Sequence, residues 1–512
     1  MKVIIVGGVA GGATAAARIR RLNEHAEITV FERSGYISYA NCGLPYYIGD
    51  VITDPEELTL QTPESFFKRF RINMKIYHEV ISIHPECKTV SVKNLENGEI
   101  FEENYDKLIL SPGAKPTQPR LPGVGIDKLF TLRTVEDTFR IKEYINKNHP
   151  KSAVLAGGGF IGLELAENLR ELGMDVTIVQ RPKQLMNPFD PDMASMIHNE
   201  MRKHGIKLVL GYTVEGFKEK DNGVEVLLKD NPSLQADMVV LAIGVTPDTV
   251  LAKEAGLELG IKESIVVNDR METSVPDIYA AGDAVQVKHY VTGNDALISL
   301  AGPANKQGRI IADNICGGDS RYLGSQGSSV IKVFDMTAAT TGINETNAKK
   351  SGLEVDTAIH AGLNATQLED LDLAYAPPYS SAKDPVNMAG FMIDNIAKGT
   401  LKQWHLEDMD KISKDKDVVL LDVRTVGEFS RGHIDGFKNI PVDELRERNS
   451  EIEKGKPVYL ICQSGLRSYI ASRILEGNGY ETYNFSGGFR FYDAVVNDRA
   501  LIERAYACGM DY

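Results

Sequence analysis

The chain has 512 residues, 43% apolar and 25% charged, a globular composition that predicts three or four domains and excludes intrinsic disorder, collagen and a coiled-coil rod. A net charge of −14 argues against non-specific binding to nucleic acid or to an anionic membrane. The longest apolar runs, such as residues 238–245, are far shorter than the ~20 residues of a membrane span, and the first residues enter a strand without a signal peptide. We therefore expect a cytoplasmic protein with neither a nucleic-acid nor a membrane partner.

The cysteines are few and form no CxxC pair, which argues against a disulfide framework and a zinc site. No metal is expected, and any functional cysteine should act alone. The five are Cys42, Cys87, Cys316, Cys462 and Cys508.

Residues 2–32 predict a dinucleotide-binding unit: a strand at 2–8, a helix at 12–23 and a second strand at 28–32. The turn keeps the first and last glycines of a GxGxxG motif but has Val9 at the middle one. Glu32, 25 residues after Gly7, is placed to accept ribose hydroxyls, while the helix N-terminus holds the pyrophosphate. The candidate binding residues are Gly7, Gly8, Ala10, Gly11, Gly12 and Glu32.

The pattern recurs about 150 residues later, with a strand ending in AVLAGGG, a helix at 160–172 and a strand at 175–180. Gly157, Gly159 and Gly162 complete GxGxxG. One such turn could be only a tight strand–helix connection, but two in register predict two bound nucleotides. The second strand ends at Gln180, followed by Arg181 and Lys183, where an NAD-selective site usually has an acid, so a 2′-phosphate would meet cations.

The first ~325 residues resemble the FAD-dependent pyridine nucleotide-disulfide reductase family. Residues 105–116 and 237–249 are similar to the segments that link its two nucleotide domains, and residues 273–284 to its second FAD motif, in which Asp283 would bond the ribityl chain. The resemblance implies an FAD-binding domain at 1–150 and 250–326 and an NAD(P)H-binding domain at 151–249. It adds Arg33, Gly113, Gly282 and Asp283 to the FAD candidates, and assigns Gly157, Gly159, Gly162, Gln180 and Arg181 to NAD(P)H.

Cys42 lies ten residues after Glu32 in SYANCGLPY, before a helical turn that begins near Pro45. No second cysteine follows within a few residues, so Cys42 should react with an external sulfur or with oxygen. A thiol whose pKa is lowered by a helix N-terminus or a cation would be ionised and ready to attack, whereas the alternative is a buried structural cysteine.

Among single-cysteine members, SYANCGLPY resembles the coenzyme A-disulfide reductases and the NADH-dependent persulfide and polysulfide reductases. NADH oxidases and peroxidases typically have a histidine where this chain has Ala10, so oxygen is disfavoured as the acceptor. The alternatives that stay open are an NADH oxidase or peroxidase, and a redox-sensing protein with impaired turnover.

By the same resemblance, coenzyme A would be bound by Arg18, Arg21, Ser38, Asn41 and Asn305, although a solvated basic face is the ordinary interpretation of such arginines.

Residues 327–398 resemble the family's dimerisation domain, which implies a homodimer. Too few residues lie near the joint at Asp356 and Thr357, so this domain is expected to be shortened. Tyr375 matches the second of two active-site tyrosines and would protonate a leaving thiolate across the dimer.

Residues 401–512 resemble a rhodanese domain. In its C-x-x-G-x-R loop, Cys462 to Arg467, backbone amides at a helix N-terminus would lower the thiol pKa and stabilise a persulfide. Protein tyrosine phosphatases have a loop one residue longer. Asp422, Arg424 and His433 are expected to be structural.

Together these features predict an α/β protein with two interleaved Rossmann-like nucleotide-binding domains, a shortened α+β dimerisation domain and a C-terminal rhodanese domain. Its predicted activity is reduction of coenzyme A disulfide, coenzyme A persulfide or polysulfide by NAD(P)H and FAD.

Overall fold

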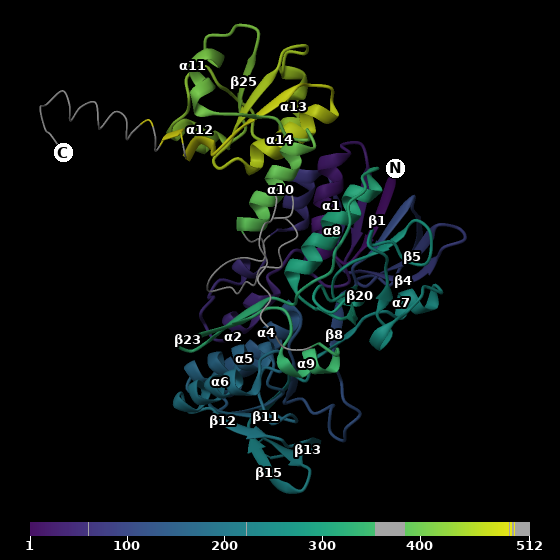
Figure 1. The fold of residues 1–512 in the computed structure, drawn as a ribbon, viewed down its shortest axis with the longest axis vertical. Coiled ribbons are helices and arrows are strands. Elements are labelled where there is room, and N and C mark those ends of the chain that lie inside the picture. The colour runs from purple at the N-terminus through teal and green to yellow at the C-terminus, as the bar shows by residue number, and fades with distance from the viewer. Residues whose placement is uncertain (60, 222, 354–384, 491, 494–495, 497–512) are drawn as a thin grey trace, which may run out of the picture.

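The computed structural model describes residues 1–353 except 60 and 222, residues 385–490, and residues 492, 493 and 496 (Figure 1). The joint at Asp356 and Thr357, Tyr375 and Cys508 lie outside this part of the chain, so the expectations for them remain predictions. Within the described residues, no helix is both long and apolar enough to cross a bilayer.

The N-terminal unit is built on a parallel five-stranded sheet with the order β19-β7-β1-β2-β3. Its apolar strands are almost completely buried, and α8 packs along α1 on one side of the sheet. The predicted strand–helix–strand order is confirmed, with the helix beginning two residues earlier than expected because Val9 is its N-cap. The elements are β1 (Lys2–Val6), α1 (Ala10–Leu22), β2 (Glu27–Phe31), β3 (Asn73–Lys75), β7 (Lys107–Leu110), β19 (Ile278–Ala280) and α8 (Ala301–Ile315).

A second parallel five-stranded sheet, in the order β12-β11-β10-β16-β9, repeats this arrangement. The helix and strand predicted at 160–172 and 175–180 are both present. The two linking segments pair as the antiparallel strands β8 (Ala114–Pro116) and β17 (Val245–Pro247). The elements are β9 (Leu129–Thr131), α4 (Val135–Asn148), β10 (Ser152–Ala156), α5 (Phe160–Glu171), β11 (Asp175–Gln180), α6 (Pro191–Lys203), β12 (Lys207–Leu210) and β16 (Met238–Leu241).

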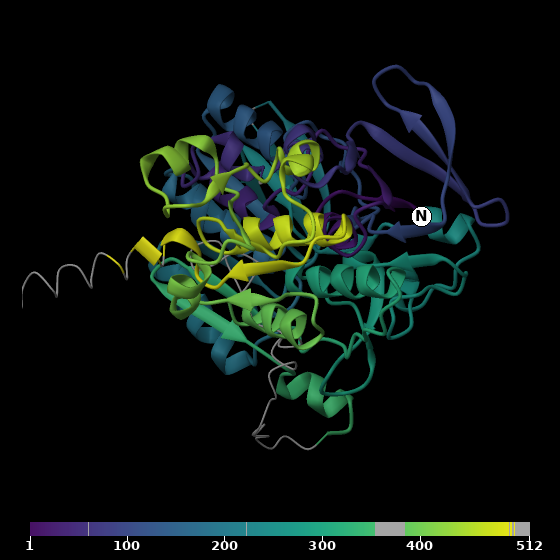
Figure 2. The ribbon, with the colours of Figure 1, turned by 90° about the horizontal axis from the view of Figure 1, so that it is seen from above.

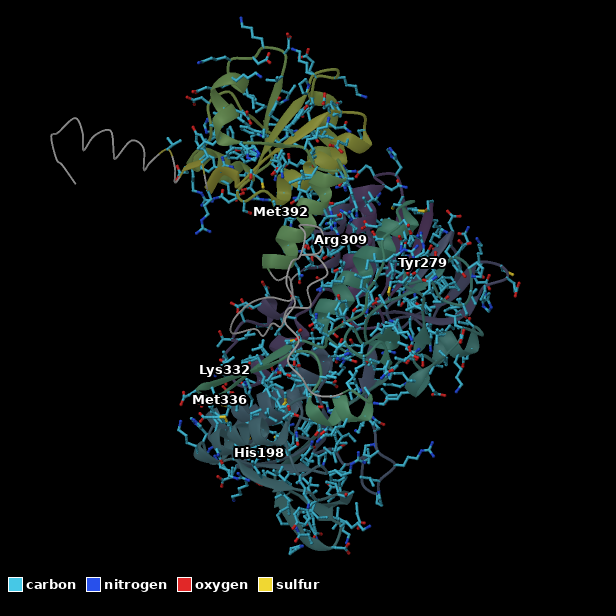
Figure 3. The ribbon with its side chains drawn as sticks, viewed as in Figure 1. His198, Tyr279, Arg309, Lys332, Met336 and Met392 are labelled. Atoms are coloured by element: carbon cyan, nitrogen blue, oxygen red, sulfur yellow. The ribbon has the colours of Figure 1, made fainter. Side chains whose placement is uncertain are left out.

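Smaller elements of the N-terminal region include α7 (Val250–Glu254) and the three-stranded sheet of β18 (Ile265–Val266), β20 (Val285–Lys288) and β21 (Asp295–Ala296). Two antiparallel three-stranded sheets are β4 (His78–His84), β5 (Thr89–Asn94), β6 (Ile100–Asn104) and β13 (Val214–Lys220), β14 (Gly223–Leu228), β15 (Asn231–Ala236). The hairpin β22 (Ser329–Val333) and β23 (Met336–Thr340) lies on α5, where Lys332 pairs with Glu167 (Figure 3). Further helices are α2 (Leu44–Ile48), α3 (Pro63–Phe70), α9 (Glu345–Lys350) and α10 (Pro385–Ala397).

The C-terminal region is a third α/β unit, with a parallel sheet in the order β24-β28-β27-β25-β26. The Trp404 side chain is buried here and donates its indole N–H to the carbonyl of Leu460, 3.2 Å away. Figures 1 and 2 show this unit beside α1 and α10. Its elements include β24 (Gln403–Trp404), α11 (Met409–Ile412), β25 (Val419–Asp422), α12 (Val426–Arg431), β26 (Lys438–Asn439), α13 (Leu445–Arg448), β27 (Val458–Ile461), α14 (Leu466–Gly477) and β28 (Thr482–Phe485). The predicted α/β fold class is confirmed.

Candidate functional site

The first glycine-rich turn brings the N-terminus of α1 against its own strand. The N–H of Gly8 donates to Oε2 of Glu32 over 2.9 Å, so the acid that directly follows β2 lies at the turn. A Cβ at Gly12 would lie 1.9 Å from the carbonyl oxygen of Gly7, so only glycine permits this approach. Among the described residues, no side chain caps α1 and its first turn has no acid. Its free N–H groups and positive dipole end therefore suit a pyrophosphate.

The second turn reproduces this geometry. The N–H of Gly158 donates to Oε1 of Gln180 over 3.0 Å, as Gly8 does to Glu32. A Cβ at Gly162 would lie 2.1 Å from the Gly157 carbonyl oxygen, whereas one at Gly159 meets no atom within 4 Å. Space for a ligand therefore remains at the N-terminus of α5, which is again uncapped by any described side chain. Arg181 and Lys183 follow in exposed positions.

The second flavin motif abuts the first turn. A Cβ at Gly11 would lie 2.8 Å from Oγ of Ser111 and 3.3 Å from Cβ of Ala281. Ala281 is the residue that precedes Gly282 in the second flavin motif. Asp283 pairs with Arg133 at 2.5 Å. Sequence reasoning missed Arg133 because no motif surrounds it.

Asp248 connects two further FAD candidates, Arg33 and Gly113. Arg33 pairs with Asp248 at 2.8 Å, and the N–H of Asp248 donates to the carbonyl of Gly113 over 3.0 Å. These contacts join the first and second linking segments beside the first sheet.

Cys42 lies in a short 3-10 helix, Asn41–Gly43, that leads directly into α2. Its side chain is half-buried, and α2 packs against both α5 and α4. The N–H of Ser38 donates to the carbonyl of Gly8 over 2.9 Å, which joins the cysteine segment to the first turn. Cys42 is thus held between the two nucleotide units. The Oδ1 atom of Asn41 is buried without a hydrogen-bond partner in the described chain, so it is available to a ligand.

The remaining coenzyme A candidates lie on α1 and α8. Asn305 accepts a hydrogen bond from Thr14 over 2.7 Å. The Arg18 side chain is 3% exposed and pairs with Asp313 at 2.8 Å. Arg18 and Arg21 both contact Tyr469 of α14, whereas Ser38 bonds to the first glycine turn, so these candidates lie in two different neighbourhoods.

The C-x-x-G-x-R loop surrounds the sulfur of Cys462. This side chain is buried, and its Sγ accepts hydrogen bonds from the N–H of Gly465 at 3.1 Å and from the Ser468 hydroxyl at 3.2 Å. Arg467 makes two 2.7 Å hydrogen bonds to Glu428. These bonds are the main reason why the pKa of Glu428 is lowered to about 2. The loop therefore directs two neutral donors at this sulfur, beside the N-terminus of α14.

The nearby charged residues expected to be structural are buried or stacked. Arg424 and Asp422 are each 1% exposed and paired at 2.7 Å, with the guanidinium over the Phe489 ring. The His433 ring stacks on Phe429. Arg424 also donates to Oε1 of Gln463, the residue after Cys462, over 3.5 Å, which is consistent with a role in supporting the loop.

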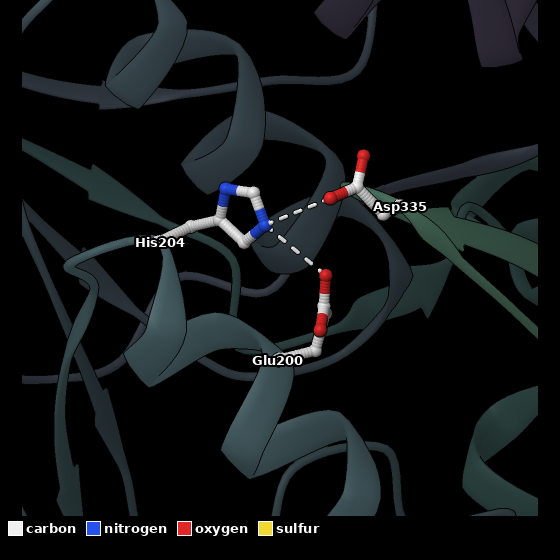
Figure 4. A group of neighbouring side chains, drawn as sticks. All are labelled: Glu200, His204 and Asp335. Carbon is white, nitrogen blue, oxygen red and sulfur yellow. Dashed lines mark hydrogen bonds and ion pairs between the residues drawn. The ribbon is translucent and has the colours of Figure 1, made fainter.

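Glu200, His204 and Asp335 gather where α6 meets the turn of the β22–β23 hairpin (Figure 4). Nε2 of His204 lies 3.1 Å from Glu200 and 3.5 Å from Asp335. Lys203 pairs with the same two carboxylates at 3.5 and 3.6 Å. We interpret the group as an ion-pair cluster that attaches the hairpin to α6, because a lysine already neutralises its acids.

The family model described as pyridine nucleotide-disulphide oxidoreductase matches residues 1–308, and the rhodanese-like domain model matches residues 405–494. The chain belongs to the pyridine nucleotide-disulphide oxidoreductase family. It is an FAD-dependent oxidoreductase that uses NAD(P)H, and it carries a rhodanese domain. The uncapped helix ends at two glycine turns fit these two nucleotides.

The coenzyme A disulfide reductase of Staphylococcus aureus (strain JH9) is 34% identical over 440 residues, covering 76% of this chain and 99% of that protein. The crystal structure of reduced Bacillus anthracis CoADR-RHD has 44% sequence identity to this chain and a TM-score of 0.68, and the match covers 97% of this chain and 98% of that chain. The structure of an NAD-dependent persulfide reductase from A. fulgidus has 34% sequence identity and a TM-score of 0.68, and the match covers 96% of this chain and 100% of that chain. A water-forming NADH oxidase from Lactobacillus brevis is less similar, with 28% identity, coverage of 78% and 100%, and a TM-score of 0.67.

Proposed function

We propose that this enzyme reduces coenzyme A disulfide, or a coenzyme A persulfide or polysulfide, through Cys42. The observation that carries the proposal is the position of Cys42 between the two nucleotide turns, joined to the first by the Ser38–Gly8 bond. The similarity to coenzyme A disulfide and persulfide reductases supports the same substrates. The NADH oxidase alternative has less support, since Ala10 occupies the position of the oxidases' turn histidine and the oxidase match is weaker.

The chain's own residues would act in a fixed order. The Cys42 thiolate attacks one sulfur of the substrate, a Cys42–sulfur bond forms and the substrate S–S bond breaks, and the first thiolate leaves and takes a proton. Bound FAD supplies the transfer of an electron pair from NAD(P)H. We assign the proton donor to Tyr375 of the partner subunit in a homodimer, as the family resemblance implies.

The FAD would be held by the first turn, Glu32, Asp283 and the linking segments, and NAD(P)H by the second turn. We propose that residues 1–150 and 250–326 form the FAD-binding domain, 151–249 the NAD(P)H-binding domain, 327–398 the dimerisation domain and 401–512 the rhodanese domain. A cytoplasmic location is part of the same proposal. Coenzyme A would contact Ser38 and Asn41 near the cysteine and Arg18, Arg21 and Asn305 further along α1 and α8.

The test replaces Cys42 with serine, with Cys87→Ser as the matched control because Cys87 is exposed and has no motif around it. Anaerobic NAD(P)H oxidation is measured with coenzyme A disulfide and with coenzyme A persulfide. Cys42→Ser should retain FAD absorbance and lose both reductions, while Cys87→Ser keeps them. Retained turnover in Cys42→Ser would refute the assignment. Flavin reduction by NAD(P)H without turnover of any acceptor in the unaltered protein would favour a redox sensor instead.

We further propose that the rhodanese domain delivers sulfur to the reductase through a shared thiol carrier. Cys462 would hold sulfane sulfur as a persulfide in its loop of N–H donors, and a tether keeps the two sites at high local concentration. Cys462→Ser should lose sulfur transfer from thiosulfate or polysulfide and slow NADH-driven sulfide release, yet leave coenzyme A disulfide reduction nearly unchanged. Equal sulfide release in both proteins would show that the domains act separately.

A further inference from the structure

The second glycine turn is supported by the segment that follows β11. The N–H of Met186 donates to the carbonyl of Gly158, the second residue of the turn, over 2.8 Å. A Cβ at Gly158 would lie 2.3 Å from Cδ2 of Leu185, so this side chain packs directly on the turn. Leu185 and Met186 are both completely buried. The segment therefore holds in place the backbone that leads into α5.

The backbone of Met186 depends on its surroundings. Its φ is +50°, in the left-handed region, which a residue with a side chain rarely adopts and which costs free energy unless the contacts around it fix it. The Met186 carbonyl accepts the N–H of Phe189 over 2.9 Å, in addition to the bond that Met186 makes to Gly158. A displacement of the adjoining Leu185 backbone would therefore disturb both contacts with the turn.

His198 of α6 provides the acceptor for the backbone of Leu185. The Leu185 N–H donates to Nε2 of His198 over 3.0 Å, and the histidine is only 8% exposed. Figure 3 labels this residue in the unit built on the second sheet. An Nε2 atom that accepts belongs to a neutral ring with its proton on Nδ1. Without this acceptor, a buried backbone N–H would be left unpaired, which is costly.

The surroundings of His198 favour the neutral ring. Burial lowers its pKa below the ordinary value, and the Arg202 guanidinium on the same helix lowers it further. Charged side chains described near the end of α6 and on the hairpin that packs against it are taken up in the cluster of Figure 4 and in the Lys332–Glu167 pair. The segment before α6 and strand β12 add Arg181, Lys183, Asp190 and Lys207. The ring therefore gains a second proton only below about pH 6.5, the ordinary pKa of histidine.

The first half of the segment is anchored elsewhere. The N–H of Gly211, directly after β12, is shared between the carbonyls of Gln180 and Pro182 at 2.9 and 3.0 Å. A Cβ at Gly211 would lie 3.3 Å from Cγ of Lys183. The residues expected to meet a 2′-phosphate, Arg181 and Lys183, therefore depend on Gly211 rather than on His198.

We propose that His198 is a positioning residue of the pyridine-nucleotide site, which as a neutral acceptor holds Leu185 and Met186 against Gly158. Its effect passes through the position of the turn, and the proposal rests on the proposed binding of NAD(P)H there. Protonation turns Nε2 from an acceptor into a donor, so the affinity for NAD and for NADP falls together as the ring is protonated.

The test measures the Kd of NAD+ by calorimetry on the full, FAD-loaded chain from about pH 8 to about pH 5. His198→Leu removes the acceptor, whereas His198→Gln keeps a neutral acceptor near the position of Nε2 that does not titrate in this range. His204→Gln is the matched control, because this ring on the same side of the unit contacts Phe334 and Asp335 of the hairpin. NAD+ suits the pH series, since the 2′-phosphate of NADP+ itself titrates near pH ~6.

At about pH 8, His198→Leu should raise the Kd at least about fivefold, because a buried N–H loses its partner. His198→Gln and His204→Gln should bind NAD+ like the unaltered protein at this pH. Below about pH 6.5 the Kd should rise in the unaltered protein and in His204→Gln, and should stay level in His198→Gln. Thermal unfolding and flavin absorbance at each pH show that the samples are folded.

A level profile in the unaltered protein would overturn the proposal, and so would a profile of His198→Gln that rises in parallel with it. This comparison decides the matter even if His198→Leu does not fold. In a folded His198→Leu protein at about pH 8, the Kd of NADP+ should rise by the same factor as that of NAD+. A rise for NADP+ alone would overturn the proposal by moving the effect to the 2′-phosphate.

Gly159→Ser, which puts a side chain into the turn itself, separates the role of His198 from the binding of the nucleotide at this turn. A higher Kd in Gly159→Ser with an unchanged Kd in His198→Leu refutes the role of His198 alone. Unchanged values in both variants refute the binding of the nucleotide at this turn as well. A higher Kd in His198→Leu with an unchanged one in Gly159→Ser overturns the proposal, because the histidine would then act by another route.

Discussion

Replacing Gly159 with serine should weaken NAD(P)H binding and leave the fold intact. Gly159 is the N-cap of α5, with an extended φ of −92°, and a Cβ there meets no protein atom within 4 Å. Serine is at least as good an N-cap as glycine, so the free energy of unfolding should stay equal or rise by a few tenths of a kcal/mol. Its hydroxyl would accept the helix N–H groups that the second turn otherwise offers to the pyrophosphate.

The expected loss follows from those N–H groups. A hydrogen bond to a charged partner contributes about 1.5–3 kcal/mol, so losing one should raise the Kd for NADH or NADPH about 10- to 150-fold. Gly162→Ala provides the contrast, because its Cβ would lie 2.1 Å from the Gly157 carbonyl oxygen and the helix must move. That variant should lose stability as well as affinity.

The assay combines calorimetric titration of NADH with thermal unfolding, and flavin absorbance checks that the first site is unaffected. Gly159→Ser should keep its FAD and its unfolding temperature while its Kd rises. A folded Gly159→Ser protein that binds NADH with unaltered affinity would show that the pyrophosphate does not lie at this turn.

Three further changes test other parts of the molecule. Asp422→Asn leaves the buried Arg424 without its ion partner and should lower the free energy of unfolding of the C-terminal unit by about 3–5 kcal/mol, measured by urea denaturation. Arg467 lowers the pKa of Glu428 from its ordinary value to about 2, so this pair stabilises the fold above about pH 5 and the contribution is lost as the pH falls towards 2. Glu428→Gln should remove up to about 3 kcal/mol of that acid dependence in unfolding curves recorded from pH 7 to pH 2, and unchanged curves would contradict the assignment. The unaltered enzyme should accept NADPH at a rate comparable to NADH, whereas Gln180→Glu should favour NADH by about tenfold or more in kcat/KM. A thousandfold NADH preference in the unaltered enzyme would show that another group rejects the 2′-phosphate.

The parts of this molecule that sequence could predict are those encoded locally. The two turns and their helices follow from glycine spacing and strand periodicity within about thirty residues. The long-range pairs could not be predicted in this way. Arg133 and Asp283 are 150 residues apart, and Arg18 and Tyr469 are 451 apart, and no local pattern records either contact. The arginine pattern of α1 predicts a ligand site or a solvated face, but it contains no information about the contacts of Arg18 and Arg21 with the C-terminal domain.

The contact between α1 and the C-terminal domain also has a consequence during synthesis of the chain. Glu24 is made near the beginning, and its partner Arg446 is made 422 residues later. At translation rates of ~5–20 residues per second, this face of α1 waits roughly 20–80 s before its partner emerges from the ribosome. During that interval β1, α1 and β2 are already made, while Glu24 and Arg21 still lack their contacts with Arg446 and Arg473. The N-terminal units therefore have to fold without this interface, which can form only after most of the chain has been made.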